Sequence, residues 1–146
     1  MATTNFGSAI KTGSGLGQGS DAGFAVLSQN QEVNFITQAG GGNDNIDFYF
    51  DLPAGSQIQN IVVDTLTAWN SVTSAGMVFG TSAGGTQYMS SVDVKSNGRE
   101  APTFTAAQLT AMADISTNTR VYGRVAQSGN TSAGKALVTV VYVQKN

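Results

Sequence analysis

The sequence predicts an all-β sandwich of about eight short strands, and two observations support this fold class. From Gly23 onward, short segments with alternating apolar and polar residues recur, and they are rich in β-branched and aromatic side chains. Clusters of Gly, Pro, Asn, Asp and Ser separate these segments, as turns separate strands. A β-barrel and a seven-stranded sandwich agree with the same observations and stay open as alternatives.

Residues 1–22 are predicted to form a flexible, Gly-rich N-terminal arm ahead of the sandwich domain, which spans residues 23–146. Glycines and small polar residues dominate the arm, and the apolar residues Phe6, Ile10 and Leu16 interrupt it. Isolated apolar residues of this kind can anchor an arm on a neighbouring subunit. A loose tail with three incidental apolar residues explains the segment equally well.

The strand predictions follow the two-residue alternation along the chain. Between residues 46 and 51, apolar residues alternate with Asp47, Tyr49 and Asp51, which is typical of a strand with one face in water. Residues 136–142 are apolar on both faces, so this strand is expected in a central position or against a second subunit. The predicted strands are Gly23–Ser28, Glu32–Gln38, Ile46–Leu52, Gln57–Trp69, Gly76–Thr81, Gln87–Val94, Thr119–Ser128 and Lys135–Gln144.

One segment breaks the strand pattern and predicts a short helix near residues 105–113. Thr105 and Gln108 have the spacing of a capping box, in which each side chain accepts a hydrogen bond from the other's backbone amide. Leu109 and Met112 are expected on one side of this helix. The helix lies in a long connection between strands, which is usual in jelly rolls, so we expect a jelly-roll-like sandwich.

The composition excludes several classes of function. Only 11% of the residues are charged, against about 25% in typical soluble domains, and the net charge is −2. The seven basic residues are scattered along the sequence, whereas nucleic-acid binding needs clustered Lys and Arg. The chain has no Cys and no His, which removes disulfides, thiolate metal sites and the commonest general base.

Targeting signals are also missing from the sequence. No apolar run approaches the roughly 18 residues that span a membrane, and the N-terminal residues lack the apolar core of a signal peptide. We therefore expect no membrane association, synthesis in the cytoplasm, and a final location that is reached by assembly.

Carboxylates and hydroxyls are the remaining candidates for chemistry. Asp47, Asp51 and Asp64 could supply an acid–base pair of the kind that glycosidases use. Alternation places the first two on a solvated strand face, which is the favoured interpretation. The abundant Ser and Thr residues lack His, the usual base for a nucleophile. The sequence thus predicts that the protein is not an enzyme and binds no cofactor, with a small hydrolase or metal-dependent enzyme as the least favoured alternative.

The loop at residues 40–47 resembles one unit of a calcium-binding Gly-Gly-x-Gly-x-Asp repeat. Oxygen atoms of Asn43, Asp44, Asn45 and Asp47 could approach a hard cation. Such repeats act as stacked arrays, and this sequence has a single imperfect copy. A polar turn is therefore the favoured interpretation, and no metal site is predicted.

Trp69 is the one tryptophan of the chain and ends the longest predicted strand. A binding platform is conceivable at such a residue. A lone aromatic residue at a strand end is more often a core cap or an interface anchor.

Two stretches carry a pattern that resembles a known class of proteins. The first is Phe48–Ile58 (FYFDLPAGSQI), and the second, between Asp64 and Val94, includes Ala68-Trp69-Asn70-Ser71, Val78–Thr86 (VFGTSAGGT) and Tyr88. Over residues 45–143 the chain resembles the small decoration or cement proteins encoded near the major capsid protein in tailed bacteriophages. The resemblance implies a jelly-roll-like β-sandwich, a homo-oligomer with a trimer favoured, and no catalytic residues.

The function implied by this resemblance is structural. The protein is expected on the capsid surface of the virion, where it binds the major capsid protein and stabilises the phage head. The predicted capsid or subunit contacts are Phe6, Ile10, Leu16 and Trp69. The alternative is a head-fibre, tail or receptor- or glycan-binding β-module of the virion, which would use Tyr, Trp and Asn or Asp on one rim.

Overall fold

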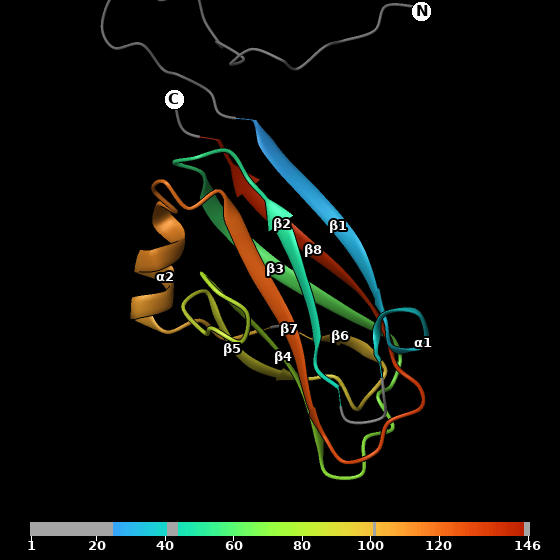
Figure 1. Cartoon of the computed structure of the whole chain (residues 1–146). Helices are drawn as coiled ribbons and strands as arrows, with labels where there is room; N and C mark the ends of the chain where they lie inside the picture. The colour runs from blue at the N-terminus through green and yellow to red at the C-terminus, as the bar shows by residue number, and fades with distance from the viewer. Residues whose placement is uncertain (1–24, 41–43, 101, 145–146) are drawn as a thin grey trace, which may run out of the picture.

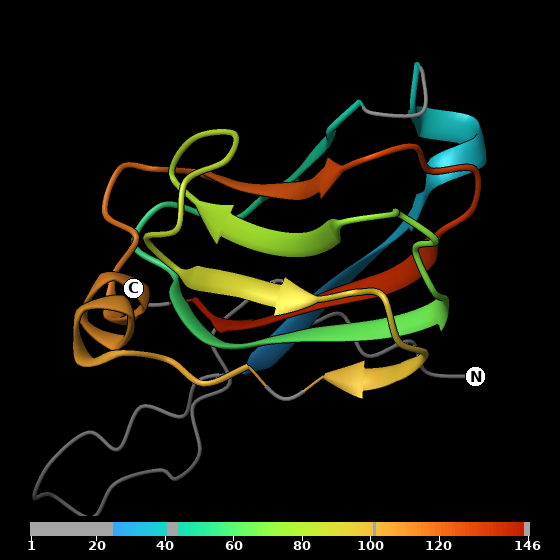
Figure 2. The same cartoon turned by 90° about the horizontal axis from the view of Figure 1, so that it is seen from below.

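The computed structural model describes residues 25–40, 44–100 and 102–144, which form two four-stranded antiparallel sheets packed face to face (Figure 1 and Figure 2). The first sheet has the order β1 (Val26–Asn34), β8 (Lys135–Val143), β3 (Gln57–Thr67) and β6 (Gly98–Glu100). The second has the order β2 (Ile46–Asp51), β7 (Arg120–Ser128), β4 (Ser74–Gly80) and β5 (Met89–Asp93). The predicted all-β sandwich is confirmed. The arm predicted for residues 1–22 lies outside the described residues.

The chain crosses between the two sheets at nearly every connection. Only β4 and β5 follow each other within one sheet. β8 lies between β1 and β3, which agrees with the central position expected for a strand with apolar residues on both faces. The crossings also bring distant segments together, because β2 pairs with β7 from Ile46 opposite Val125 to Asp51 opposite Arg120.

The core lies between the sheets and takes alternate residues from each strand. Ile46, Phe48 and Phe50 of β2 point inward and are buried. The ring of Phe48 meets that of Phe79 edge-on, with the ring centres 5.5 Å apart. Burying an apolar side chain of this size contributes about 1.5–3 kcal/mol, so the alternation decides which face of each strand turns inward.

Helix α2 (Ala106–Ala113) confirms the predicted helix and its capping box. The Gln108 amide donates to Thr105 Oγ1 at 3.3 Å, and the Thr105 amide donates to Gln108 Oε1 at 2.9 Å. The expected common face of Leu109 and Met112 is wrong, because Met112 is buried and Leu109 is 53% exposed. The helix buries Gln108 together with Met112 instead.

Gln108 is buried because it connects α2 to the second sheet. Its Nε2 donates to the Thr86 carbonyl at 3.0 Å and to the Ser90 hydroxyl at 2.9 Å. A buried amide is tolerated when its hydrogen bonds are made, so this polar residue takes a place that an apolar one was expected to fill.

The two strands predicted at Gly23–Ser28 and Glu32–Gln38 are wrong as separate elements. β1 runs without interruption from Val26 to Asn34. Its middle is polar because β1 is an edge strand with its outer face exposed. Residues Phe35–Gln38 form a further short helix, α1, in which the Ile36 amide donates to Asn34 Oδ1 at 3.0 Å. The described residues therefore hold two helices, neither long nor apolar enough to cross a membrane.

β6 is missing from the predicted strands. Its three residues show no apolar alternation, and its position is set by pairing with β3, where Arg99 lies opposite Asp64. The other strands differ from the predictions by one or two residues at their ends.

Candidate interaction site

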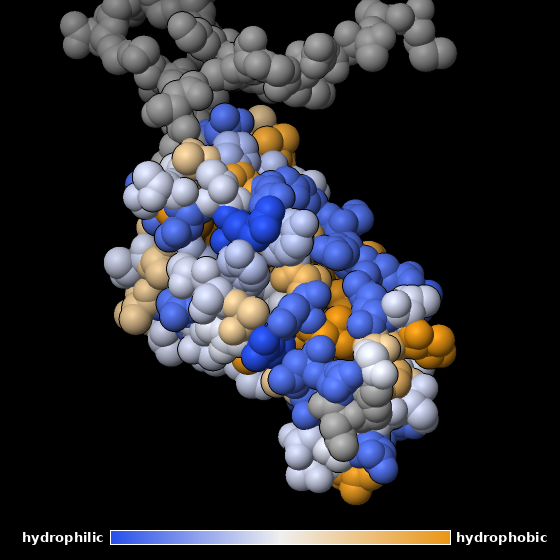
Figure 3. Space-filling view, in the orientation of Figure 1, coloured by the Kyte–Doolittle hydropathy of each residue, from blue (hydrophilic) through white to orange (hydrophobic). Residues whose placement is uncertain are grey.

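The outer face of the β2–β7 pair carries six polar and aromatic side chains that we call the Arg–Tyr ladder. Its members are Asp47, Tyr49, Asp51, Arg120, Tyr122 and Arg124. In register they make three rungs: a carboxylate faces a guanidinium at each end, and two phenol rings face each other between them. They point outward because the residues between them on both strands are in the core or face it. Figure 3 shows hydrophilic side chains gathered on this side, over β2 and β7.

Bidentate ion pairs form the two end rungs. Arg124 donates from Nε and Nη2 to the carboxylate oxygens of Asp47 at 2.5 and 2.8 Å. Arg120 donates in the same way to Asp51 at 2.8 and 3.3 Å. The hydrogen bond from Arg124 lowers the pKa of Asp47 below its usual range, and the hydrogen bond to Asp51 raises the pKa of Arg120. The planar fork of Arg makes such pairs geometrically specific.

The middle rung is aromatic and partly exposed. Tyr49 is 49% exposed, and the centre of its ring lies 6.4 Å from that of Tyr122. The guanidinium carbon of Arg120 lies 3.8 Å from the centre of the Tyr49 ring, in a cation–π contact. Alternate residues of a strand are about 7 Å apart, so three rungs cover about 14 Å of surface. Tyr and Arg are enriched at binding hot spots, and here their side chains are already held in place.

The ladder is suited to recognition and not to acid–base chemistry. Asp47 and Asp51 are exposed, which confirms that they lie on a solvated face, and each is neutralised by an arginine. Asp64 lies in the other sheet, 2.7 Å from Arg99, and the hydrogen bond from Arg99 lowers the pKa of Asp64. The three carboxylates are therefore not brought together.

Three oxygen-bearing groups in the described part of the loop at 40–47 bond within the protein. Asp47 pairs with Arg124, Asn45 Oδ1 accepts from the Gln127 amide at 3.2 Å, and the Asp44 carbonyl accepts from Gln127 Nε2. Asn43 lies outside the described residues. Among residues 25–40, 44–100 and 102–144, no three acidic side chains gather as a metal-binding group.

Ser132 and Lys135 have a spacing that some serine nucleophiles share with their lysine base. The structure engages both side chains elsewhere. Lys135 Nζ lies 3.0 Å from a carboxylate oxygen of Glu32, and the Ser132 hydroxyl accepts from Asn70 Nδ2 at 2.8 Å. This spacing therefore does not form a nucleophile–base pair.

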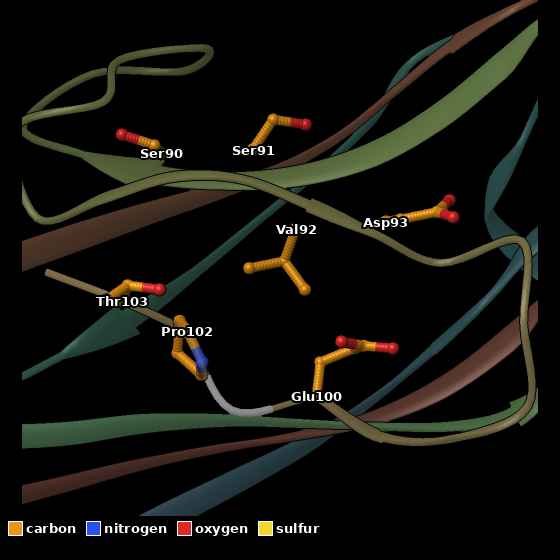
Figure 4. A pocket seen from close by; sticks show the side chains of 7 residues that line it. All are labelled: Ser90, Ser91, Val92, Asp93, Glu100, Pro102 and Thr103. Carbon is orange, nitrogen blue, oxygen red and sulfur yellow. The ribbon is translucent and has the colours of Figure 1, made fainter.

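Two open hollows flank the edge strand β5. One has a volume of about 240 Å³ and is lined by Ser90, Ser91, Val92, Asp93, Glu100, Pro102 and Thr103 (Figure 4). In Figure 4, Val92 points into this hollow, and Asp93 and Glu100 come from opposite walls. The other, of about 550 Å³, lies over β4 and β5 around Gly76. Small-molecule pockets are enclosed and mostly apolar, so neither hollow resembles one.

Trp69 lies in the core and is 1% exposed. Its amide donates to the Val94 carbonyl at 3.0 Å. Its ring packs so closely on Gly134 that a Cβ there would lie 2.3 Å from a ring atom. Of the interpretations given for this residue, the core cap matches the structure, because an outside contact would require the ring to leave the core. The other predicted contacts, Phe6, Ile10 and Leu16, lie outside the described residues.

The ladder is not evident as a unit from the sequence. Arg120 and Arg124 are two of the scattered basic residues, and their partners lie 69 and 77 positions away along the chain. The signal that could have found it is a match between two alternating segments, since acid–aromatic–acid on one strand complements base–aromatic–base on another.

Comparison with known proteins supplies a likeness of fold. No protein-family model matches the sequence, and no curated protein matches it. A solved structure titled the cyanophage Pam1 capsid asymmetric unit contains a similar chain, with a TM-score of 0.58 and 20% sequence identity. The match covers 99% of this chain and 100% of that chain. At this identity the likeness shows a shared fold over nearly the whole chain.

Proposed function

We propose that the protein is a non-enzymatic structural protein of a tailed-phage virion, which decorates the head and stabilises it by binding the major capsid protein. The end-to-end likeness of fold to a chain of a phage capsid asymmetric unit carries this proposal. The resemblance of residues 45–143 to capsid decoration proteins supports the same function. The proposed location is the outer surface of the capsid, reached after synthesis in the host cytoplasm.

We assign the sandwich to the jelly-roll class and propose a trimer. The strand orders 1-8-3-6 and 2-7-4-5 agree with an eight-stranded, two-sheet jelly roll. The trimer is the oligomer that the resemblance to decoration proteins implies. A sandwich of this kind is a stiff body, which suits a protein that has to hold other subunits in place.

We propose the Arg–Tyr ladder as the centre of the contact with the major capsid protein. Asp51 holds Arg120 over the ring of Tyr49, which lies beside that of Tyr122. The Tyr49 ring is therefore in place before any partner arrives, so binding orders few side chains. A stable contact buries about 1,600 Å² in total, and the ladder would form the middle of such an area. Phe6, Ile10 and Leu16 are proposed as additional anchors on a neighbouring subunit.

The decisive experiment compares virions with and without this protein. Particles that lack it are expected to release DNA at a lower temperature, and adding back the purified protein is expected to restore their resistance. Tyr49→Ala is expected to weaken binding to these particles about tenfold or more, as truncation of a hot spot does. Val72→Ala, at a residue that is 77% exposed in a distant loop, serves as the control and should bind normally. Absence of the protein from purified particles would overturn the proposal.

A receptor- or glycan-binding module of a head fibre or tail is the second candidate. The exposed phenol ring between carboxylates and guanidinium groups favours it, because such a surface offers both an aromatic face and hydrogen-bond partners. Labelling that places the protein at the tail, or selective glycan binding that Tyr49→Ala abolishes, would favour this candidate over head decoration.

A further inference from the structure

β1 is the least protected of the four strands at the sheet edges. Proteins protect such edges with short length, bulges, charges or Pro. β6 has three residues, β5 pairs irregularly with β4, and β2 carries Asp47 and Asp51. β1 has nine residues in unbroken register with β8, contains no Pro, Lys or Arg, and has Glu32 as its one charged residue.

The register shows which backbone groups of β1 are free. The Phe35 amide donates to the Gly134 carbonyl at 2.9 Å, so alternate residues back to Leu27 direct their N–H and C=O groups toward β8. The backbone groups of the residues between them therefore face away from the sheet. These residues are Val26, Ser28, Asn30 and Glu32. Within the described ranges, their outward backbone groups have no hydrogen-bond partner.

Helix α1 closes this free edge at one end. The Asn34 amide donates to Gln38 Oε1 at 2.6 Å, and the Asn34 carbonyl accepts from Thr37 Oγ1 at 3.4 Å. The open part of the edge thus runs over Val26–Glu32. Its outer face is apolar at the Val26 end, where that residue is 66% exposed, and ends in the ion pair of Glu32 with Lys135.

We propose that this edge binds the N-terminal segment of a neighbouring copy of the chain, added as a further strand along Val26–Glu32. The segment Thr3–Lys11 (TTNFGSAIK) contains β-branched and aromatic residues, and Lys11 is its one charged side chain. Phe6 and Ile10 are four positions apart, so in a strand they share one face. That face can lie on the same side of the sheet as Val26, at the apolar end of the edge.

The chain that precedes β1 is long enough to reach another copy. Residues 12–25 separate this segment from β1, and they are rich in glycine. Fully extended, fourteen residues span about 45 Å, which exceeds the roughly 30 Å diameter of a small domain. The choice of a neighbouring copy rests on the proposed structural function, in which copies have to be tied together.

Cross-linking of the full-length protein tests the proposal, because the chain has no native Cys. Ile10→Cys protein is mixed with size-tagged Ser28→Cys protein and oxidised. The cross-linked heterodimer is expected to exceed the control mixture by about tenfold or more, as the high effective concentration of a docked segment requires. The control uses size-tagged Ser91→Cys, since Ser91 is equally an exposed serine on an edge strand, β5.

A proline substitution in β1 tests whether the cross-link depends on backbone pairing or on chance proximity. In the size-tagged Ser28→Cys protein, Asn30→Pro removes an outward N–H and should reduce the cross-link about tenfold, whereas Asn30→Ala should leave it unchanged. Circular dichroism checks that both variants keep the fold. Equal cross-linking at Ser28 and Ser91, or a disulfide confined to single chains of the Ile10→Cys/Ser28→Cys double variant, would overturn the inference. Either result leaves the virion function standing, since that function fails only if purified particles lack the protein.

Discussion

At some positions no side chain fits, because the ring of a distant residue packs directly against the backbone. A Cβ at Gly123 would lie 2.4 Å from the ring of Phe48, and one at Gly134 would lie 2.3 Å from the ring of Trp69. These contacts join residues far apart in the chain, so the sequence alone does not show that glycine is required at these positions. The outward direction of Asp47 and Asp51 is different, because it follows from the two-residue period of a strand and could be predicted.

Asp47→Asn is expected to lower the free energy of unfolding at neutral pH, by about 0.2–1 kcal/mol as for other exposed ion pairs. The hydrogen bond from Arg124 lowers the pKa of Asp47 in the folded state. A lowered folded pKa stabilises the fold above the unfolded pKa of about 3.9, and this contribution is lost as the pH falls through the folded value. Urea unfolding at several pH values should therefore show the two proteins converging below about pH 4.

The partner residue supplies the control for this prediction. In an Arg124→Gln background the ion pair is already missing, so the effect of Asp47→Asn should be smaller at neutral pH. High salt should also reduce the difference, because it screens exposed charges. A difference that stays constant down to strongly acidic pH would contradict the assignment to the ion pair.

Among the helices and strands, the ones that could be predicted are those that a short stretch of sequence identifies by itself. α2 is encoded by Thr105 and Gln108, which form the capping box within one turn. β6 has no such signal, since its position comes from pairing with β3. The local pattern also leads to a wrong prediction for β1 and α1. The polar centre of β1, an edge strand, suggests a turn, and Phe35, the first residue of α1, suggests that the strand continues.

The burial pattern of α2 leads to a prediction about two of its residues. Met112→Ala is expected to lower the free energy of unfolding by about 2–5 kcal/mol, because it leaves a cavity in the core. Leu109→Ala is the control on the same helix, and its effect should stay within about 0.5 kcal/mol because Leu109 faces water. Both values come from urea unfolding. Equal losses would mean that Leu109 is buried as well, as the sequence spacing alone suggests.

On the scale of the whole molecule, the sequence predicts two packed sheets but not the order of the strands within them. Alternation identifies the inward face of most strands, which is enough to predict a sandwich. The strand order depends on long-range pairing, such as that of β2 with β7, and no local pattern records it. The Arg–Tyr ladder exists only once that pair has formed, so the candidate site could not be predicted even though each of its residues lies on a predicted strand.

The predicted division of the chain into an arm and a domain leads to the last prediction. Deleting residues 1–22 should leave the sandwich folded, with a free energy of unfolding within about 1 kcal/mol of the full-length value. The reason is that the eight described strands and the buried residues of the described core all lie within residues 26–143. Circular dichroism and urea unfolding measure the fold, and size-exclusion chromatography with light scattering measures the oligomer.

If the truncated protein keeps its stability but no longer forms the oligomer, the contacts between copies involve residues 1–22, as the pairing proposed for β1 requires. A truncated protein that keeps both would assign association to the sandwich itself, with the Arg–Tyr ladder as the first surface to test. A truncated protein that unfolds would contradict the domain boundary. In that case residues 1–22 would contribute to the core, and the free edge of β1 would be the place in the fold where they add to a sheet of their own chain.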